Sequence, residues 1–176
     1  MINYFELYHL SVSFHPDQET LKRKFYELSR QFHPDRFAHL GSEAMEEALN
    51  MSSINNAAYK ILKDPDALMS YILKYHGVLE DEEKYSFPPN FLMEMMELNE
   101  AVSEYELEPD NHELKQTAVT TLNDLLDIWQ TEVDTLLEKF DHGDHSKELL
   151  SEIKDYYFRK KYLLRIKERI AKFATL

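Results

Sequence analysis

The 176-residue sequence has no cysteine and only three glycines. Without cysteine, the chain can form no disulfide and offers no thiolate as a nucleophile or metal ligand. The glycines, Gly41, Gly77 and Gly143, stand far apart in the chain. This spacing excludes the glycine-rich loops GxGxxG and GxxxxGK, which cradle nucleotide phosphates. We therefore expect neither of the usual nucleotide sites.

Valine is also scarce, and the 33 acidic residues outnumber the 20 basic ones. The chain holds 24 Leu but only 5 Val and 8 Ile, a balance that favours helices over strands. The net charge of -13 argues against nucleic acid as the main partner, because phosphate binding requires a concentrated basic face. No run of 18 apolar residues occurs, so we expect no membrane span, and the first residues lack the pattern of a signal peptide.

The charge is unevenly distributed along the chain. Residues 1–76 carry 8 basic and 10 acidic residues, residues 77–144 carry 3 and 19, and residues 145–176 carry 9 and 4. The middle of the chain is therefore strongly acidic, whereas its last segment is basic. Two interpretations stay open at this point. The opposite charges pair between packed helices, or they remain on the surface as solvated or functional faces.

Apolar residues recur at helical spacing through most of the chain. Asp17 is expected to cap the second helix and Ser42 the third, and Asp64-Pro65 is expected to end the third. The expected helices cover residues 3–10, 18–32, 42–63, 66–76, 89–107, 110–140 and 146–174.

A change in composition divides this series of helices. The acidic stretch 78–90 ends in Phe87-Pro88-Pro89-Asn90, which is typical of a connecting segment. We place one domain at 1–76, a linker at 77–88 and a second domain at 89–176. The last three helices are joined by short turns, and this predicts an antiparallel three-helix bundle. The fold class is therefore all-α.

The tripeptide His-Pro-Asp occurs twice. In His15-Pro16-Asp17 it precedes a helix, where a proline and an aspartate cap are expected for structural reasons alone. The second copy, His33-Pro34-Asp35, lies between two helices, where the proline ends the first and displays its neighbours at the tip of a hairpin. Five cations accompany it, and they are equally consistent with a solvated face or a docking surface: Lys22, Arg23, Lys24, Arg30 and Arg36.

The second copy and its surroundings resemble a J-domain. The residues that carry this resemblance are His33-Pro34-Asp35, Asn3-Tyr4-Phe5, Asn55-Asn56-Ala57-Ala58-Tyr59 and Leu62-Lys63-Asp64-Pro65. The resemblance implies that the loop and its five cations engage the ATPase of a DnaK-type chaperone. It also implies that Asp35 is needed to stimulate ATP hydrolysis by that partner. We expect Asn55, Asn56 and Tyr59 to stabilise the hairpin and not to contact a partner. Glu27 stands among the cations, which departs from the strongest DnaJ-like pattern.

One segment of the second half has two helical faces. Phe91, Met95, Leu98, Val102 and Tyr105 recur at offsets of 4, 3, 4 and 3, as a core stripe does. Beside this stripe are three surplus apolar residues and three carboxylates, namely Leu92, Met93, Met96, Glu97, Glu100 and Glu104. They form either an apolar protein-binding patch edged by acid or a wider core stripe with a solvated edge.

The whole chain resembles the HscB family, the J-type co-chaperones of iron–sulfur cluster assembly. The resemblance is carried by the segment 91–105 and by the preceding stretch Tyr71-Ile72-Leu73-Lys74-Tyr75-His76-Gly77. The resemblance implies an L-shaped adaptor without enzymatic activity. It implies that the second domain binds an IscU-type scaffold and that the first delivers it to the DnaK-type chaperone HscA. The implied scaffold contacts are Leu92, Met93, Met96, Glu97, Glu100, Glu104 and Phe158. Because cysteine is absent, we expect the chain not to carry the cluster itself. We also expect no metal and no cofactor.

Two rival functions stay open. One is a J-protein with a different client. The other is a helical metal-dependent enzyme, for which Asp141-His142-Gly143-Asp144-His145 offers a ligand cluster, although these residue types are also expected in a turn. The expected location is the bacterial cytoplasm, with a processed form in the mitochondrial matrix as the alternative.

Overall fold

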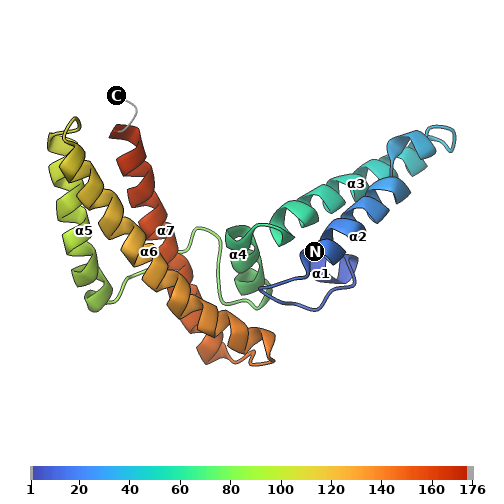
Figure 1. Ribbon diagram of the computed structural model, residues 1–176. Helices are drawn as coiled ribbons and strands as arrows, with labels where there is room; N and C mark the ends of the chain where they lie inside the picture. The colour runs from blue at the N-terminus through green and yellow to red at the C-terminus, as the bar shows by residue number, and fades with distance from the viewer. Residues whose placement is uncertain (1, 174–176) are drawn as a thin grey trace. The chain divides into compact units, whose positions relative to one another are not determined.

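The computed structural model describes residues 2–173, which form seven α-helices, one 3-10 turn and no strand (Figure 1). The expected all-α class is confirmed. Two compact units are present, of which the first ends at His76 and the second begins at Gly77. No helix within residues 2–173 is long and apolar enough to cross a membrane. The helices are α1 (Tyr4–Leu7), α2 (Gln18–Gln31), α3 (Ser42–Leu62), α4 (Pro65–Tyr75), α5 (Pro89–Leu107), α6 (His112–Asp141) and α7 (Lys147–Phe173).

Short polar side chains set most helix starts. The Asp17 carboxylate accepts a hydrogen bond of 2.7 Å from the Thr20 amide, so the expected cap of α2 is confirmed. Asp64 caps α4, and Pro65 is the first residue of that helix. The expectation for α3 was wrong, because Ser42 is already helical and the capping position is Gly41, which provides no side-chain bond. Gly41 has a φ of 101°, a conformation that glycine adopts without steric cost.

The first unit is a hairpin of α2 and α3 supported by α1 and α4. Phe25 of α2 stacks on Tyr59 of α3 with ring centroids 4.3 Å apart. At the other end of the unit, Tyr4 stacks on Tyr71 of α4 and donates its backbone N–H to that residue's hydroxyl at 2.9 Å. The open end of the hairpin carries a 3-10 turn, Pro34–Arg36. Packing therefore fixes the two helices that hold the His33-Pro34-Asp35 loop.

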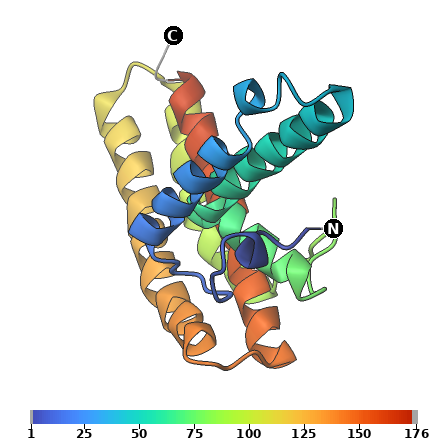
Figure 2. The ribbon, with the colours of Figure 1, turned by 90° about the vertical axis from the view of Figure 1, so that its right-hand side faces the viewer.

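The second unit is a three-helix bundle in which α5, α6 and α7 lie side by side (Figures 1 and 2). Two polar contacts set the register of α5 against α7. Asn99 donates to the Tyr162 hydroxyl at 2.8 Å, and Arg169 forms two hydrogen bonds with Glu106 at 3.0 and 2.8 Å. Both contacts join residues 63 positions apart, so α5 and α7 run parallel, with α6 returning between them. The Glu106–Arg169 pair also shows that part of the charge contrast is internal pairing.

The segment before α5 is fastened to α7 although it forms no helix. Glu83 pairs with Lys154 at 2.5 Å, and the Tyr85 hydroxyl donates to the Asp155 carboxylate at 2.5 Å. The Tyr85 ring stacks on Phe158, with centroids 4.4 Å apart and planes 6° from parallel. We call residues 83–87 the strap. Figure 1 shows the chain passing along α7 before it enters α5. The strap thus belongs to the second unit.

Candidate protein-binding surfaces

The His33-Pro34-Asp35 loop displays two polar side chains at the tip of the first unit. Pro34 opens the 3-10 turn, and the His33 ring nitrogen accepts a hydrogen bond of 3.4 Å from the Asp35 amide. The Asp35 side chain is 89% exposed, and its carboxylate lies 3.6 Å from the His33 ring nitrogen. Neither side chain is needed to fill the core. Both are therefore available to a partner.

The cations near this loop are not equivalent. Lys22, Arg23 and Arg30 are exposed on α2, and Arg23 and Arg30 lie on the side opposite buried Leu21. Lys24 instead pairs with Glu27 at 3.0 Å, and this hydrogen bond lowers the pKa of the Glu27 carboxyl. The remaining cation, Arg36, donates to the Arg30 carbonyl at 3.1 Å and so ties the loop to the end of α2.

Sequence analysis missed an aromatic residue within the basic face. Tyr26 is 51% exposed and follows Lys22 by four residues, while Arg30 follows Tyr26 by another four. Residues at this spacing are neighbours on a helix surface, so the tyrosine stands between the two cations. The spacing from Lys22 to Arg30 was a signal that could have identified it. An exposed aromatic ring flanked by cations is typical of protein interfaces.

The other His-Pro-Asp copy is part of the framework. Pro16 is buried, and Asp17 caps α2. The hydrogen bond from Thr20 lowers the pKa of the Asp17 carboxyl. The structural interpretation of this copy is confirmed.

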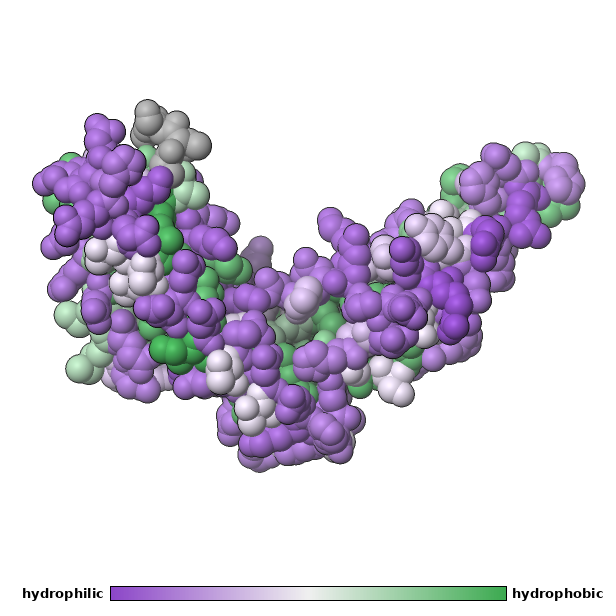
Figure 3. All heavy atoms as spheres, in the orientation of Figure 1, coloured by the Kyte–Doolittle hydropathy of each residue, from purple (hydrophilic) through white to green (hydrophobic). Residues whose placement is uncertain are grey.

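On α5, the core stripe and the surplus apolar residues differ in burial. All five stripe residues expected from the spacing are buried, from Phe91 to Tyr105. Leu92, Met93 and Met96 are 48%, 70% and 59% exposed. They are therefore not a wider core stripe. Figure 3 shows moderately hydrophobic side chains protruding over the first turns of α5 at the left edge of the molecule.

Two rows of residues follow α5 outside its core stripe. The edge row is Leu92, Met96, Asn99 and Glu106, and its last two members bond to α7. Leu92 and Met96 thus lie along the edge of α5 that borders α7. The outer row is Met93, Glu97, Glu100 and Glu104, all exposed and facing solvent.

Phe158 lies on α7 but is not an exposed contact residue. Its side chain is 8% exposed and is covered by the Tyr85 ring of the strap. Phe158 precedes Tyr162 by one helical turn, so it shares the side of α7 that faces the edge row of α5. The structure therefore brings Phe158 to the same side of the bundle as Leu92 and Met96, beneath the strap.

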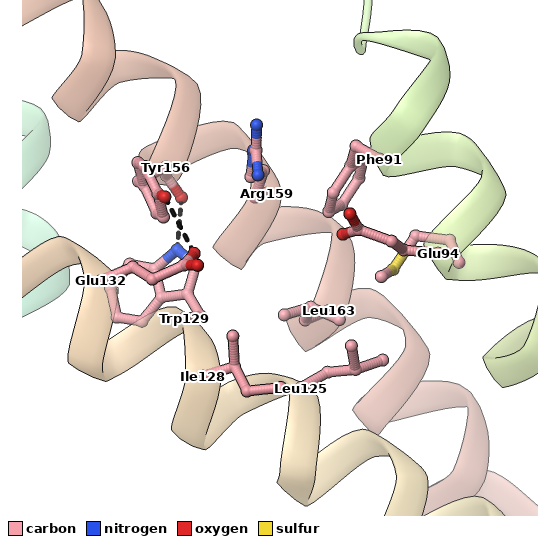
Figure 4. A pocket seen from close by; sticks show the side chains of 10 residues that line it. Phe91, Glu94, Leu125, Ile128, Trp129, Glu132, Tyr156, Arg159 and Leu163 are labelled. Atoms are coloured by element: carbon pink, nitrogen blue, oxygen red, sulfur yellow. Dashed lines mark hydrogen bonds between the residues drawn. The ribbon is translucent and has the colours of Figure 1, made fainter.

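A small cavity of about 30 Å³ opens between the three helices of the bundle (Figure 4). The Arg159 guanidinium lies over the rings of Phe91 and Tyr156, 5.2 and 5.0 Å from their centroids. The Trp129 indole donates to the Tyr156 carbonyl at 2.8 Å, and the Tyr156 hydroxyl donates to Glu132 at 2.8 Å. Burial and this carboxylate raise the pKa of Tyr156 to about 12. Such a volume matches one water molecule, so this cavity is too small for an organic ligand.

The cluster at 141–145 provides no metal site in this structure. Asp144 accepts a hydrogen bond of 3.0 Å from the Ser146 amide, and His145 packs on Phe140. Within residues 2–173, no three histidine or carboxylate side chains converge closely enough to hold a metal ion. The turn interpretation accounts for these residues.

Comparisons with known proteins all lead to one family. A family model described as the HSCB C-terminal oligomerisation domain matches residues 87–171. A "Co-chaperone protein HscB homolog" from Neisseria meningitidis is 36% identical over 116 residues, which are 65% of this chain and 70% of the relative. Its counterpart in Colwellia psychrerythraea is 36% identical over 104 residues, which are 58% of this chain and 59% of the relative.

Two solved structures resemble the whole chain. "Chaperone HscB from Vibrio cholerae" is 26% identical with a TM-score of 0.69, over 97% of this chain and 96% of that one. The human co-chaperone protein HscB is 25% identical with a TM-score of 0.75, over 97% of this chain and 81% of that one. Both likenesses therefore span nearly all of this chain.

Proposed function

We propose, since this chain belongs to the HscB family of co-chaperones, that it delivers an IscU-type iron–sulfur scaffold to an HscA-type chaperone and stimulates that chaperone's ATPase. The members of this family are co-chaperones and not enzymes. Activity would then depend on two protein-binding surfaces, one on each unit. Since the curated relatives are bacterial, we infer a bacterial cytoplasmic setting.

The first surface is the His33-Pro34-Asp35 loop with the basic face of α2. An exposed carboxylate and exposed imidazole at a helix junction can enter a partner's groove without disturbing the core of this unit. The cations Lys22, Arg23 and Arg30 would steer an acidic surface of the chaperone towards the loop. In this proposal the first unit is the J-domain, and Tyr26 adds an apolar contact within the basic face.

The second surface is α5, and the exposure of Leu92, Met93 and Met96 is the observation that carries it. The bundle core is complete without these three side chains, because Phe91, Met95 and Leu98 already fill the inner face of the helix. Methionine adapts its shape to different partners, and apolar residues at the centre of an interface supply most of its affinity. Glu97, Glu100 and Glu104 would form the polar rim.

Two measurements on the full chain test this proposal. Isothermal titration with an IscU-type scaffold should show one-to-one binding. In a separate assay, the chain should accelerate ATP hydrolysis by an HscA-type chaperone. Stimulation without scaffold binding would instead identify a J-protein with a different client. Scaffold binding without stimulation would reject the role of the loop.

A further inference from the structure

A groove of about 310 Å³ runs between the strap and α7. It lies wholly within the second unit. Its walls combine four aromatic rings with three cations, which are Tyr85, Phe87, Phe158, Tyr162, Lys84, Lys161 and Arg165. The groove is ten times the volume of the cavity in Figure 4, so it can admit a side chain or a short piece of backbone.

The two cations that α7 contributes to this groove have no carboxylate partner among residues 2–173. Within residues 2–173, neither Lys161 nor Arg165 forms an ion pair, and both are exposed. The Lys161 ammonium lies over the Phe158 ring, 6.0 Å from its centroid. Glu83 also lines the groove, but Lys154 pairs with it and lowers its pKa. The groove is therefore locally positive, although residues 77–144 as a whole are strongly acidic.

Two residues that line the groove, Phe87 and Tyr162, also contact α5. Phe87 stacks on Phe91 with centroids 4.9 Å apart, and the Tyr162 hydroxyl accepts the bond from Asn99. Leu92 and Met96 share the edge row with Asn99, so they border the same side of the bundle. A partner that covers Leu92 and Met96 would reach the groove next.

We propose that this groove binds an acidic segment of the client, whose carboxylates meet Lys161 and Arg165 while an apolar side chain packs on the aromatic wall. This inference rests on the proposed function, since it assigns a second contact to the client held by α5. Carboxylates form strong charge-assisted bonds with guanidinium and ammonium groups, and aromatic walls supply apolar contact. The outer row of α5 attracts basic residues instead. The client would thus present basic and acidic segments side by side.

Because the outer row of α5 is acidic and the groove is basic, the direction in which a groove substitution changes client affinity distinguishes the two alternatives. If the client presents only positive charge, Lys161 and Arg165 repel it, and their removal strengthens binding. If the groove holds an acidic segment, the same removal weakens binding. We expect Lys161→Ala and Arg165→Ala each to raise the dissociation constant for an IscU-type scaffold about two- to fivefold at low salt. The double variant should lose about tenfold, and less at high salt.

Lys167→Ala is the matched control, because it removes the same charge from the same helix. Lys167 is exposed and lies about 120° around α7 from Lys161, at about 100° per residue. It should leave the dissociation constant unchanged. Circular dichroism should be identical for all variants, since none of these side chains is buried. Arg165→Lys should retain most of the affinity.

Each result has a distinct meaning. If the wild-type chain does not bind the scaffold, the proposed function itself fails. If Leu92→Ala weakens binding but the groove variants bind as well as the wild type or better, the inference alone is overturned. A second copy of this chain is the other possible occupant, with its acidic α5 in the groove. In that case sedimentation would show a dimer for the wild type and a monomer for the groove variants, and the scaffold affinity would be unchanged. This result too would overturn the inference.

Discussion

The Tyr8 hydroxyl donates a hydrogen bond of 2.7 Å to the side-chain oxygen of Asn55, and both residues are fully buried. The Asn55 amide in turn donates to the Phe25 carbonyl and the Ser29 hydroxyl, both at 3.0 Å. One buried amide therefore joins α2, α3 and the residue that follows α1. This connection holds together the hairpin that carries the His33-Pro34-Asp35 loop.

Removing the Tyr8 hydroxyl should destabilise this hairpin. Tyr8→Phe leaves the Asn55 oxygen buried without its side-chain donor, and such a loss costs about 1–3 kcal/mol. Urea denaturation followed by circular dichroism measures the change. Tyr75→Phe is the control, because Tyr75 is exposed and should change the free energy of unfolding by less than about 0.5 kcal/mol. Equal values for the two variants would show that the buried bond adds no stability.

The two His-Pro-Asp copies should respond differently to the same substitution. Asp35→Asn should abolish stimulation of the HscA-type ATPase without changing stability, because the side chain is exposed and has no role in packing. Asp17→Asn should leave stimulation intact, since asparagine caps a helix about as well as aspartate. Steady-state ATP hydrolysis with each variant measures the difference. Loss of stimulation in both variants would contradict the assignment of separate roles.

On α5, apolar and acidic substitutions should weaken scaffold binding in different ways. Replacing Leu92, Met93 and Met96 with Ala removes the central contacts and should weaken binding more than tenfold at any salt concentration. Replacing Glu97, Glu100 and Glu104 with Gln should have a smaller effect that largely disappears at high salt, because exposed charges are screened over about 10 Å at 0.1 M. Titration calorimetry at two salt concentrations measures both. Unchanged affinity in the apolar variant would remove α5 as the client surface.

Regular helical spacing explains why much of the fold was predictable. The buried stripe from Phe91 to Tyr105 was predicted from offsets of 3 and 4, and the Asp17 cap from its place before an apolar series. The resemblance to the HscB family is likewise confirmed by the comparisons. Both signals are local in the sequence. The stripe and the cap depend on neighbours a few residues apart, and the resemblance depends on short motifs, so a single chain is sufficient to detect them.

Contacts between segments distant in sequence were not predictable in this way. Tyr85 and Phe87 lie in a stretch without periodicity, and only the folded chain shows that they pack on Phe158 and Phe91. The family resemblance implied Phe158 as a scaffold contact without showing that the strap covers its side chain. The start of α3 was misassigned for a related reason. A polar side chain was expected to cap the helix, but the turn required the positive φ of Gly41.

Alkaline pH should loosen the strap. Burial and the hydrogen bond to Asp155 raise the pKa of Tyr85 from its ordinary value of 10.0 to about 12. Because the pKa is higher in the folded than in the unfolded chain, the stabilisation from this hydroxyl is complete below pH 10. It is lost as the pH rises from 10 to about 12.

Tyr85→Phe isolates this effect, since the ring can still stack on Phe158 while the hydroxyl is gone. Asp155 keeps its pairing with Arg159 at 2.6 Å, so the variant should lose only about 1 kcal/mol at pH 8. The difference in free energy of unfolding between wild type and variant should then fall steadily as the pH rises from 10 to about 12. Tyr156 and Tyr8, whose pKa values are also raised, are present in both proteins and cancel in this comparison. A difference that stays constant from pH 8 to 12 would mean that the Tyr85 hydroxyl ionises as readily in the folded chain as in the unfolded one, and the strap would then depend on the Glu83–Lys154 pair and ring stacking alone.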